Sequence, residues 1–330
     1  MLTSMNLVRN TLNAFAFTLL SVPFLFAQTG AEKKTATEVS TSPKIVVITG
    51  NRFSYKVVQE WIDDYSKVKP DVQIIIEARG SNDPASFQIL AEVYKPEEAL
   101  QNNREYINVG RYAVLPVATN NSEFANYFLD RGLNEDLIKQ IFFNDIYADK
   151  ESQEKIEAPY TVYTRLQKAG VPLVFAKYFG YQQKDIKGTS IAGADEHLLK
   201  ALLRDPNGVT YLPLALIYDQ QTRKPIDKLT VLPVDLNGNG KVNEAEKFYG
   251  DLDKVIEQLE ARQSDDIKNV PIEYLHLSVD KQTATPEAID FLKWVNENGQ
   301  GYLHKYGYLQ PEAKYFEKDK FKEFAAERNR

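Results

Sequence analysis

The sequence has 330 residues, and its 46 acidic side chains exceed its 40 lysines and arginines to give a formal net charge of −6. Nucleic acids and anionic membrane surfaces repel a negative protein, so this balance argues against both as partners. The chain contains no cysteine, which excludes disulfides and a lipoprotein attachment site and leaves a hydrophobic core as the source of stability.

The N-terminus has the pattern of a secretory signal peptide. Arg9 precedes the apolar stretch 14–26, which is too short for a permanent membrane span, and Ala27-Gln28 offers a cleavage point. We therefore expect residues 1–27 to be removed on export to the periplasm or another extracytoplasmic compartment, with an uncleaved anchor as the alternative. Residues 28–43 are polar and aperiodic, which predicts a flexible linker.

Strands and helices alternate from Lys44 onward, which predicts an α/β fold with mostly parallel sheets flanked by helices. The predicted strands cover residues 44–49, 71–78, 112–118, 209–218, 229–234 and 272–279. The predicted helices begin near Ser54, Pro84, Asn134, Asp195 and Pro286, and the last helices carry Phe316, Phe321 and Phe324. The length of this part of the chain predicts two lobes.

A twelve-residue stretch fits the calcium-binding loop of an EF-hand at every constrained position. Oxygen-bearing side chains stand at loop positions one, three and five, glycine at position six and a carboxylate at position twelve. The expected Ca²⁺ ligands are Asp235, Asn237, Asn239, the Lys241 carbonyl, Asn243 and Glu246. Only the first and last of these carry a charge, so we expect weak binding and a structural role. The alternative is a polar turn without a metal ion.

No catalytic constellation stands out, so we expect a protein that is not an enzyme. The three histidines, His197, His276 and His304, lie far apart and have no metal-ligand partner at helical spacing. The chain has no thiol, no Gly-x-Ser-x-Gly elbow and no phosphate-binding P-loop. We expect His276, on a predicted strand, to be a hydrogen-bonded structural residue.

Two junctions between a strand and a helix offer a place for an anion. Each combines a glycine, a hydroxyl and an arginine, at residues 50–54 and at residues 79–82. In open α/β sheets, helix N-termini present free N–H groups beyond the carboxyl ends of the strands. Two interpretations remain open: an anion site that includes Arg52 and Arg79, or a pair of ordinary helix caps at Ser54 and Asp83.

Short motifs follow one another in a fixed order through residues 44–309. They are Ile48-Thr49-Gly50, Trp61, Pro70-Asp71-Val72, Gly80-Ser81, residues 133–142, 205–211 and 291–295, and Lys305-Tyr306-Gly307-Tyr308. In their order and spacing the chain resembles the PstS-like phosphate-binding proteins of ABC transporters, which have the two-lobed type II periplasmic-binding-protein fold. The resemblance implies crossover strands near 112–117 and 229–234, lobe one from 44–115 plus 232–326, and lobe two from 116–231.

The resemblance also implies a set of ligand-binding residues. They are Asn51, Arg52, Phe53, Ser81, Arg165 and Gly170. Phe53, Ser81 and Arg165 match the family, but both hydroxyls of its Ser-Gly-Thr motif are replaced around Gly170, and its proton-accepting aspartate has no counterpart. Each lost charge-assisted bond costs about 1.5–3 kcal/mol, so we expect weak or absent phosphate binding.

Two functions follow from this resemblance. The first is an exported, soluble and monomeric solute-binding protein that captures phosphate or another small oxyanion and delivers it to a membrane transporter. The second is an envelope protein with the same fold, a degenerate cleft and a role in protein–protein contacts. The sequence supports no nucleic acid as a partner of either.

Overall fold

The computed structural model describes residues 43–78, 87–94, 103–145, 151, 153–168, 170–312, 324 and 326. Several predictions lie outside these residues: the signal peptide, the linker up to residue 42, Arg79, Ser81, Asp83, Pro84, Phe316 and Phe321. Residues from Ser42 to Arg330 form a single compact unit, and the division of this unit into two lobes stays a prediction. None of the helices in the described ranges is both long and apolar enough to cross a membrane.

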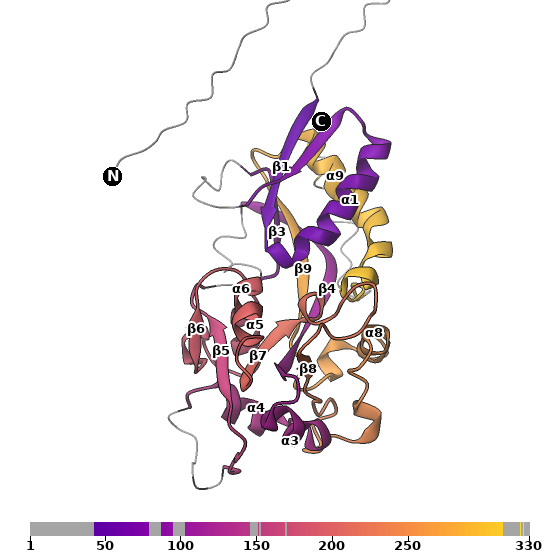
Figure 1. Ribbon diagram of the computed structural model, residues 1–330. Coiled ribbons are helices and arrows are strands. Elements are labelled where there is room, and N and C mark those ends of the chain that lie inside the picture. The colour runs from indigo at the N-terminus through magenta and orange to yellow at the C-terminus, as the bar shows by residue number, and fades with distance from the viewer. Residues whose placement is uncertain are drawn as a thin grey trace, which may run out of the picture. The chain divides into compact units, whose positions relative to one another are not determined.

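A mixed sheet organises the described chain (Figure 1). Its strands are β1 (Lys44–Gly50), β2 (Val72–Ile76), β3 (Ile89–Glu92), β4 (Arg104–Thr119), β5 (Thr161–Arg165), β6 (Thr189–Ile191), β7 (Gly208–Pro213), β8 (Leu229–Val231) and β9 (Ile272–Asp280). They follow the order β2-β1-β3-β9-β4-β7-β5-β6, with β8 beside β4. The prediction of mostly parallel sheets is corrected to a mixed sheet, because β4 runs antiparallel to β7, β8 and β9.

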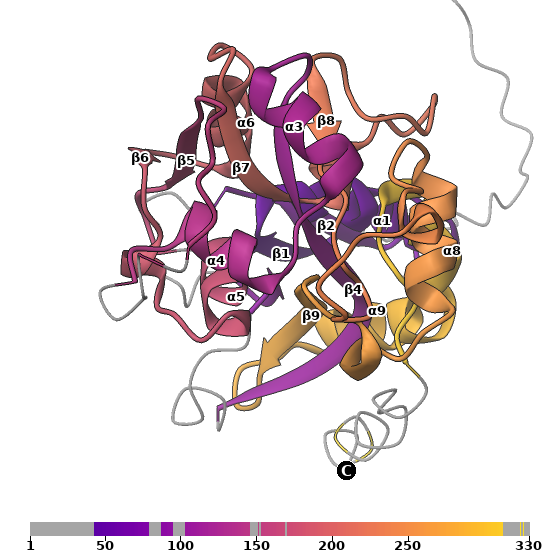
Figure 2. The same ribbon diagram turned by 90° about the horizontal axis from the view of Figure 1, so that it is seen from below.

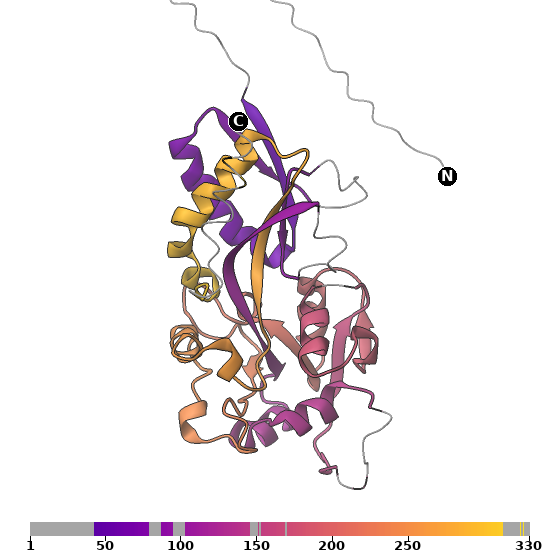
Figure 3. The ribbon, with the colours of Figure 1, turned by 180° about the vertical axis from the view of Figure 1, so that it is seen from behind.

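Strand β4 belongs to both parts of this sheet. Residues 104–113 pair with β9, whereas residues 114–119 pair with β7 and β8. Figure 3 shows the long strands β4 and β9 side by side from behind. Every residue from 109 to 119 is buried, as expected for a strand that is covered on both faces. The strand begins well before the predicted residue 112, because its polar first residues pair with β9.

The helices each bury apolar side chains. They are α1 (Tyr55–Val68), α3 (Glu123–Arg131), α4 (Glu135–Phe142), α5 (Gly170–Tyr178), α6 (Asp195–Leu202), α7 (Leu214–Ile217), α8 (Leu252–Glu260) and α9 (Pro286–Asn298). Helices α1 and α9 pack together through Tyr65, whose ring centroid lies 5.2 Å from that of Phe291. Helices α4 and α5 pack through Phe142 and Phe175, at 5.2 Å (Figure 2). As expected for a structural residue, His276 lies on a strand, and its Nδ1 forms a 2.7 Å hydrogen bond with Asn108.

Another predicted strand also differs from the structure. The predicted strand 209–218 ends at Pro213, and the next four residues form α7. A continuous apolar run does not distinguish a buried strand from a buried helical turn, which explains the difference. Helix α8 follows the predicted calcium loop and begins only at Leu252, because Asp251 accepts hydrogen bonds from the N–H groups of Asp253 and Lys254 and caps it there.

A buried ion pair fixes the C-terminal segment against β4. Arg111 Nη1 lies 2.8 Å from Glu312 Oε1, and the two side chains are only 4% and 6% exposed. Arg111 also donates hydrogen bonds to the Gln310 carbonyl and to Ser264 Oγ, both at 2.6 Å. The Ser264 N–H in turn donates to Glu312 Oε1 at 2.7 Å. The pair therefore joins β4 to two segments that are distant in sequence.

We expect Glu312→Ala to lower the free energy of unfolding by about 3–5 kcal/mol, because it leaves the Arg111 guanidinium buried without its carboxylate. Urea denaturation followed by circular dichroism measures this loss. The control is Glu157→Ala, which removes an exposed pair with Lys155 and should cost about 0–1 kcal/mol. Equal losses in the two variants would contradict the stabilising role of the buried pair.

Candidate functional site

Arg165, the last residue of β5, is a nearly buried cation. Its side chain is 12% exposed, and its Nη1 donates a 3.1 Å hydrogen bond to Asp195, the first residue of α6, which is 8% exposed. Burial raises the pKa of Asp195, and the neighbouring guanidinium opposes this shift. The Nε–H of Arg165 is buried and has no hydrogen-bond partner among the described residues. Asp195 therefore orients the guanidinium and leaves one buried donor unsatisfied.

Arg165 lies in the wall of a pocket with a volume of about 640 Å³. The pocket extends from the end of β5 along α5 to the short helix η3 (Gln183–Asp185), and Tyr94, which follows β3, also lines it. Four of its lining side chains are cationic: Arg165, Lys168, Lys177 and Lys184. None of the described lining residues is acidic. Of these cations only Arg165 was a predicted site residue, since nothing in the spacing of the lysines marks a site.

The structure brings two further predicted ligand residues, Asn51 and Gly170, together. A Cβ atom added to Gly170 would lie 3.4 Å from Asn51 Nδ2 and 2.4 Å from Val93 Cγ2. Val93 is fully buried, and its carbonyl accepts a 2.6 Å hydrogen bond from Tyr112 Oη. The N-terminus of α5 is thus packed against an apolar side chain, and no sequence pattern indicated a role for Val93.

The remaining predicted ligand residues have different surroundings. Arg52 is exposed at the start of η1 (Arg52–Ser54). The ring of Phe53 belongs to the core, where its centroid lies 5.6 Å from that of Tyr112. Ser54 Oγ donates a 2.7 Å hydrogen bond to the Asn51 carbonyl and accepts none from a helical N–H, so Ser54 does not cap α1 as predicted. Ser81 lies outside the described residues.

The predicted calcium loop contains two buried carboxylates. Asp235 is 1% exposed and Glu246 is 3% exposed, and neither forms an ion pair with a lysine, arginine or histidine among the described residues. The Leu236 N–H donates to Glu246 Oε1 at 2.9 Å and brings the two ends of the loop together. Burying a charge without an opposite charge is costly, so these carboxylates create an environment that favours a cation.

Hydrogen bonds hold the loop in a tight turn. Asp235 Oδ1 accepts from the Gly238 N–H at 2.8 Å, and its Oδ2 accepts from the Gly240 N–H at 2.6 Å. Gly240 has a φ of 84°, which a glycine adopts without strain. Further bonds follow the loop: Asn237 Oδ1 accepts from Asn239 N, Asn239 Oδ1 from Lys241 N, and Glu246 Oε2 from Asn243 N, all at 3.0 Å. The oxygens expected to bind Ca²⁺ thus belong to one ordered turn.

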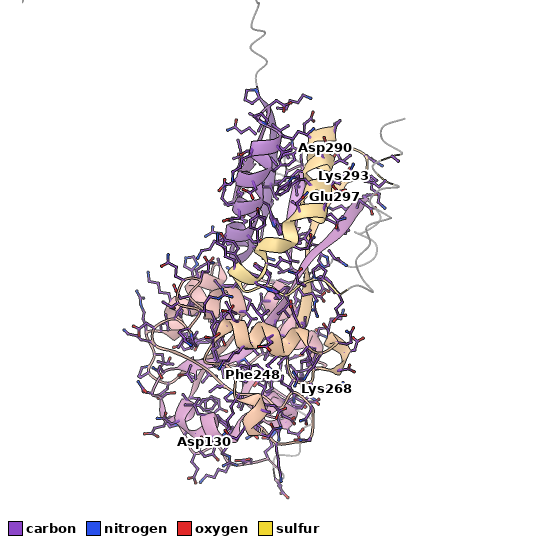
Figure 4. The ribbon with its side chains drawn as sticks, turned by 90° about the vertical axis from the view of Figure 1, so that its right-hand side faces the viewer. Asp130, Phe248, Lys268, Asp290, Lys293 and Glu297 are labelled. Atoms are coloured by element: carbon purple, nitrogen blue, oxygen red, sulfur yellow. The ribbon has the colours of Figure 1, made fainter. Side chains whose placement is uncertain are left out.

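The loop also connects distant segments. The Asp235 N–H donates to the Leu133 carbonyl at 2.9 Å, between α3 and α4. Asn269 Nδ2 donates to the Asp235 carbonyl at 2.7 Å, just before β9. Figure 4 shows Asp130 of α3, Phe248 and Lys268 on the side of the molecule that faces the viewer. No group of three His, Cys, Asp or Glu side chains in the described ranges forms a metal site, so any ion here depends on the asparagine oxygens as well.

No protein-family model and no curated protein sequence matches this chain. Among solved structures, it is similar to a protein from Clostridium perfringens that is described as a phosphate ABC transporter substrate-binding protein with bound phosphate. The TM-score is 0.60 at 16% identity, over 82% of this chain and 100% of that chain. An ABC-type phosphate transport receptor from Vibrio cholerae gives a TM-score of 0.54 at 14% identity, over 81% and 100% of the two chains.

The chain has the fold of phosphate ABC transporter substrate-binding proteins. This confirms the predicted resemblance at the level of the fold, and the α/β class with it. Arg165 is the last residue of β5, Asn51 directly follows β1, and Gly170 is the first residue of α5. Gly170 and Asn51 meet at Val93, whereas Arg165 opens onto the pocket.

We expect Gly170→Ala to destabilise the protein by about 1–3 kcal/mol, because the new methyl group overlaps Val93 Cγ2 and the site cannot expand freely. Thermal unfolding of wild type and variant measures the effect. Gly250→Ala is the matched control, since a Cβ atom there meets nothing within 4 Å. The double variant Gly170→Ala/Val93→Ala should relieve the overlap. A double variant whose cost equals the sum of the two single changes would contradict a direct contact.

Proposed function

We propose that the protein is an exported solute-binding protein that captures a small oxyanion at Arg165 and delivers it to a membrane transporter. The observation that carries this proposal is the guanidinium of Arg165, which is nearly buried, held by Asp195 and left with an unpartnered Nε–H beside an open pocket. An arginine fork pairs two oxygens at once and suits carboxylates, phosphates and similar groups. The signal-peptide pattern supports export, and the fold supports binding without catalysis.

Orthophosphate is a poor candidate for a tight ligand. The hydroxyls that would donate to it around Gly170 are missing, and Val93 packs there instead. The buried carboxylate nearest to Arg165, Asp195, is engaged by the guanidinium, so it does not serve as the acceptor for a protonated phosphate. The alternative role, an envelope protein with a degenerate cleft, is not favoured, because the pocket beside Arg165 remains open.

We expect Arg165→Ala to weaken the binding of any oxyanion ligand by about 2–4 kcal/mol, because it removes a desolvated charged contact. Isothermal titration calorimetry measures the affinity. Arg204→Ala, which removes an exposed arginine outside the pocket, is the control.

Arg165→Ala leaves Asp195 buried and unpaired. If this variant does not fold, the affinity is measured on the double variant Arg165→Ala/Asp195→Asn, which also removes the buried charge. Unchanged affinity in a folded variant would remove Arg165 from the site. Tight orthophosphate binding by the wild type would show that the missing hydroxyls are compensated.

We also propose that the loop from Asp235 to Glu246 binds one structural Ca²⁺ ion. The expected ligands are Asp235, Asn237, Asn239, the Lys241 carbonyl, Asn243 directly or through water, and Glu246. The two buried carboxylates without a cationic partner support this proposal, because Ca²⁺ would neutralise them. The connections of the loop to α4 and β9 support a structural role, since an ion that stiffens the loop also fixes these segments.

We expect saturating Ca²⁺ to raise the melting temperature of the wild type by several degrees. Binding to the native state alone adds about 2.7 kcal/mol at one hundred times the dissociation constant. Glu246→Gln should lose most of this shift, whereas Glu244→Gln, an exposed neighbour, should keep it. Differential scanning fluorimetry with Ca²⁺ or with a chelator measures both. If wild type and Glu246→Gln melt alike at saturating Ca²⁺, the loop is only a turn.

A further inference from the structure

The pocket beside Arg165 is much larger than a single oxyanion requires. Its volume of about 640 Å³ lies in the range of about 300–1,000 Å³ that is typical of sites for organic ligands. Helix α5 contributes Leu173 and Lys177 to the pocket, one turn apart on the same face. The segment after α5 contributes Tyr181 and Lys184. The lining thus continues well past Arg165 in one direction, along α5.

We call the part of the pocket beyond Arg165, lined by Lys168, Lys177 and Lys184, the extension. Its charge is positive, although the protein as a whole is acidic. Lys168, Lys177 and Lys184 are exposed at the pocket and form no hydrogen bond or ion pair with any described residue. Nearby carboxylates are engaged elsewhere: Asp145 accepts a 2.6 Å hydrogen bond from Tyr181 Oη, and Asp185 accepts one of 2.8 Å from the Gln182 N–H. A cleft lined by charges of one sign raises the local concentration of ligands of the opposite sign.

Two other polar groups of the lining, those of Tyr181 and Thr164, are already hydrogen-bonded. Burial and the hydrogen bond to Asp145 raise the pKa of Tyr181 to about 12, so its phenol stays neutral and its O–H is already in use. Thr164 Oγ1 shares a 2.6 Å hydrogen bond with Tyr211 Oη. The charged groups of the extension are its lysines, which bind phosphate groups as point charges.

We propose that the ligand is a multiply charged phosphate compound larger than orthophosphate, with one anionic group at Arg165 and a second at Lys177 and Lys184. A condensed phosphate and a phosphate ester with a second anionic group share this chemistry. The proposal rests on the oxyanion site proposed at Arg165 and names its ligand class. One orthophosphate would occupy a small part of the pocket and would leave the charge of the extension unused.

Calorimetric titrations with orthophosphate, pyrophosphate, tripolyphosphate and a sugar bisphosphate test the proposal. The expected result is an affinity at least ten-fold higher for one of the multiply charged probes than for orthophosphate. The affinity for this probe should also fall more steeply with salt, because more exposed charges are screened. A preference for the condensed phosphates or for the sugar bisphosphate distinguishes the two sources of this chemistry.

The double variant Lys177→Gln/Lys184→Gln should weaken the preferred probe at least ten-fold and leave orthophosphate unchanged. The control, Lys254→Gln/Lys293→Gln, makes the same change of charge at exposed lysines outside the pocket. Equal affinity for all probes, or an unaffected Lys177/Lys184 variant, overturns the inference and leaves the oxyanion site in place if Arg165→Ala still abolishes binding. Flat titrations with every probe overturn the oxyanion site and this inference together.

Discussion

The shared strand β4 is the constraint on which the rest of the structure depends. Its first ten residues pair with β9, and through β9 with β3, β1 and β2. Its last residues pair with β7 and β8, and through β7 with β5 and β6. Asn51, at the end of β1, and Arg165, at the end of β5, are therefore both positioned from one strand. Residues 109–119 of β4 are buried without interruption, so this strand holds the segments that carry Asn51 and Arg165 in place.

Besides Arg111 and Glu312, two other pairs of buried charged side chains in the described residues bear on the proposed functions. In the first pair, Arg165 and Asp195 neutralise each other, and the arginine keeps a donor for a ligand. In the second, Asp235 and Glu246 are both negative, and they accept hydrogen bonds from backbone N–H groups and from the Asn243 side-chain amide. The first arrangement is balanced in charge without a ligand and suits reversible capture. The second carries uncompensated charge and suits a permanently bound cation.

The sequence predicted best those features that a local pattern encodes. The predicted helix starts near Ser54, Asn134 and Pro286 agree with the starts of α1, α4 and α9. Local patterns failed where tertiary pairing decides. The early start of β4 depends on β9, and the antiparallel direction of β4 depends on partners far away in the chain. The resemblance identified Arg165, but Val93 and Lys177 join the site only through folding, so no spacing in the sequence indicated them.

Strand β9 has a consequence for the order in which the chain folds. It is the only link in the described sheet between β1–β3 and β4: Glu92 of β3 pairs with His276, and Arg104 of β4 pairs with Asp280. A nascent chain that ends before Ile272 therefore cannot complete this sheet, although most of its strands are already made. Contacts between residues so distant in sequence close long loops at an entropic cost and slow folding. Assembly of the sheet is consequently delayed until the last part of the chain has been synthesised.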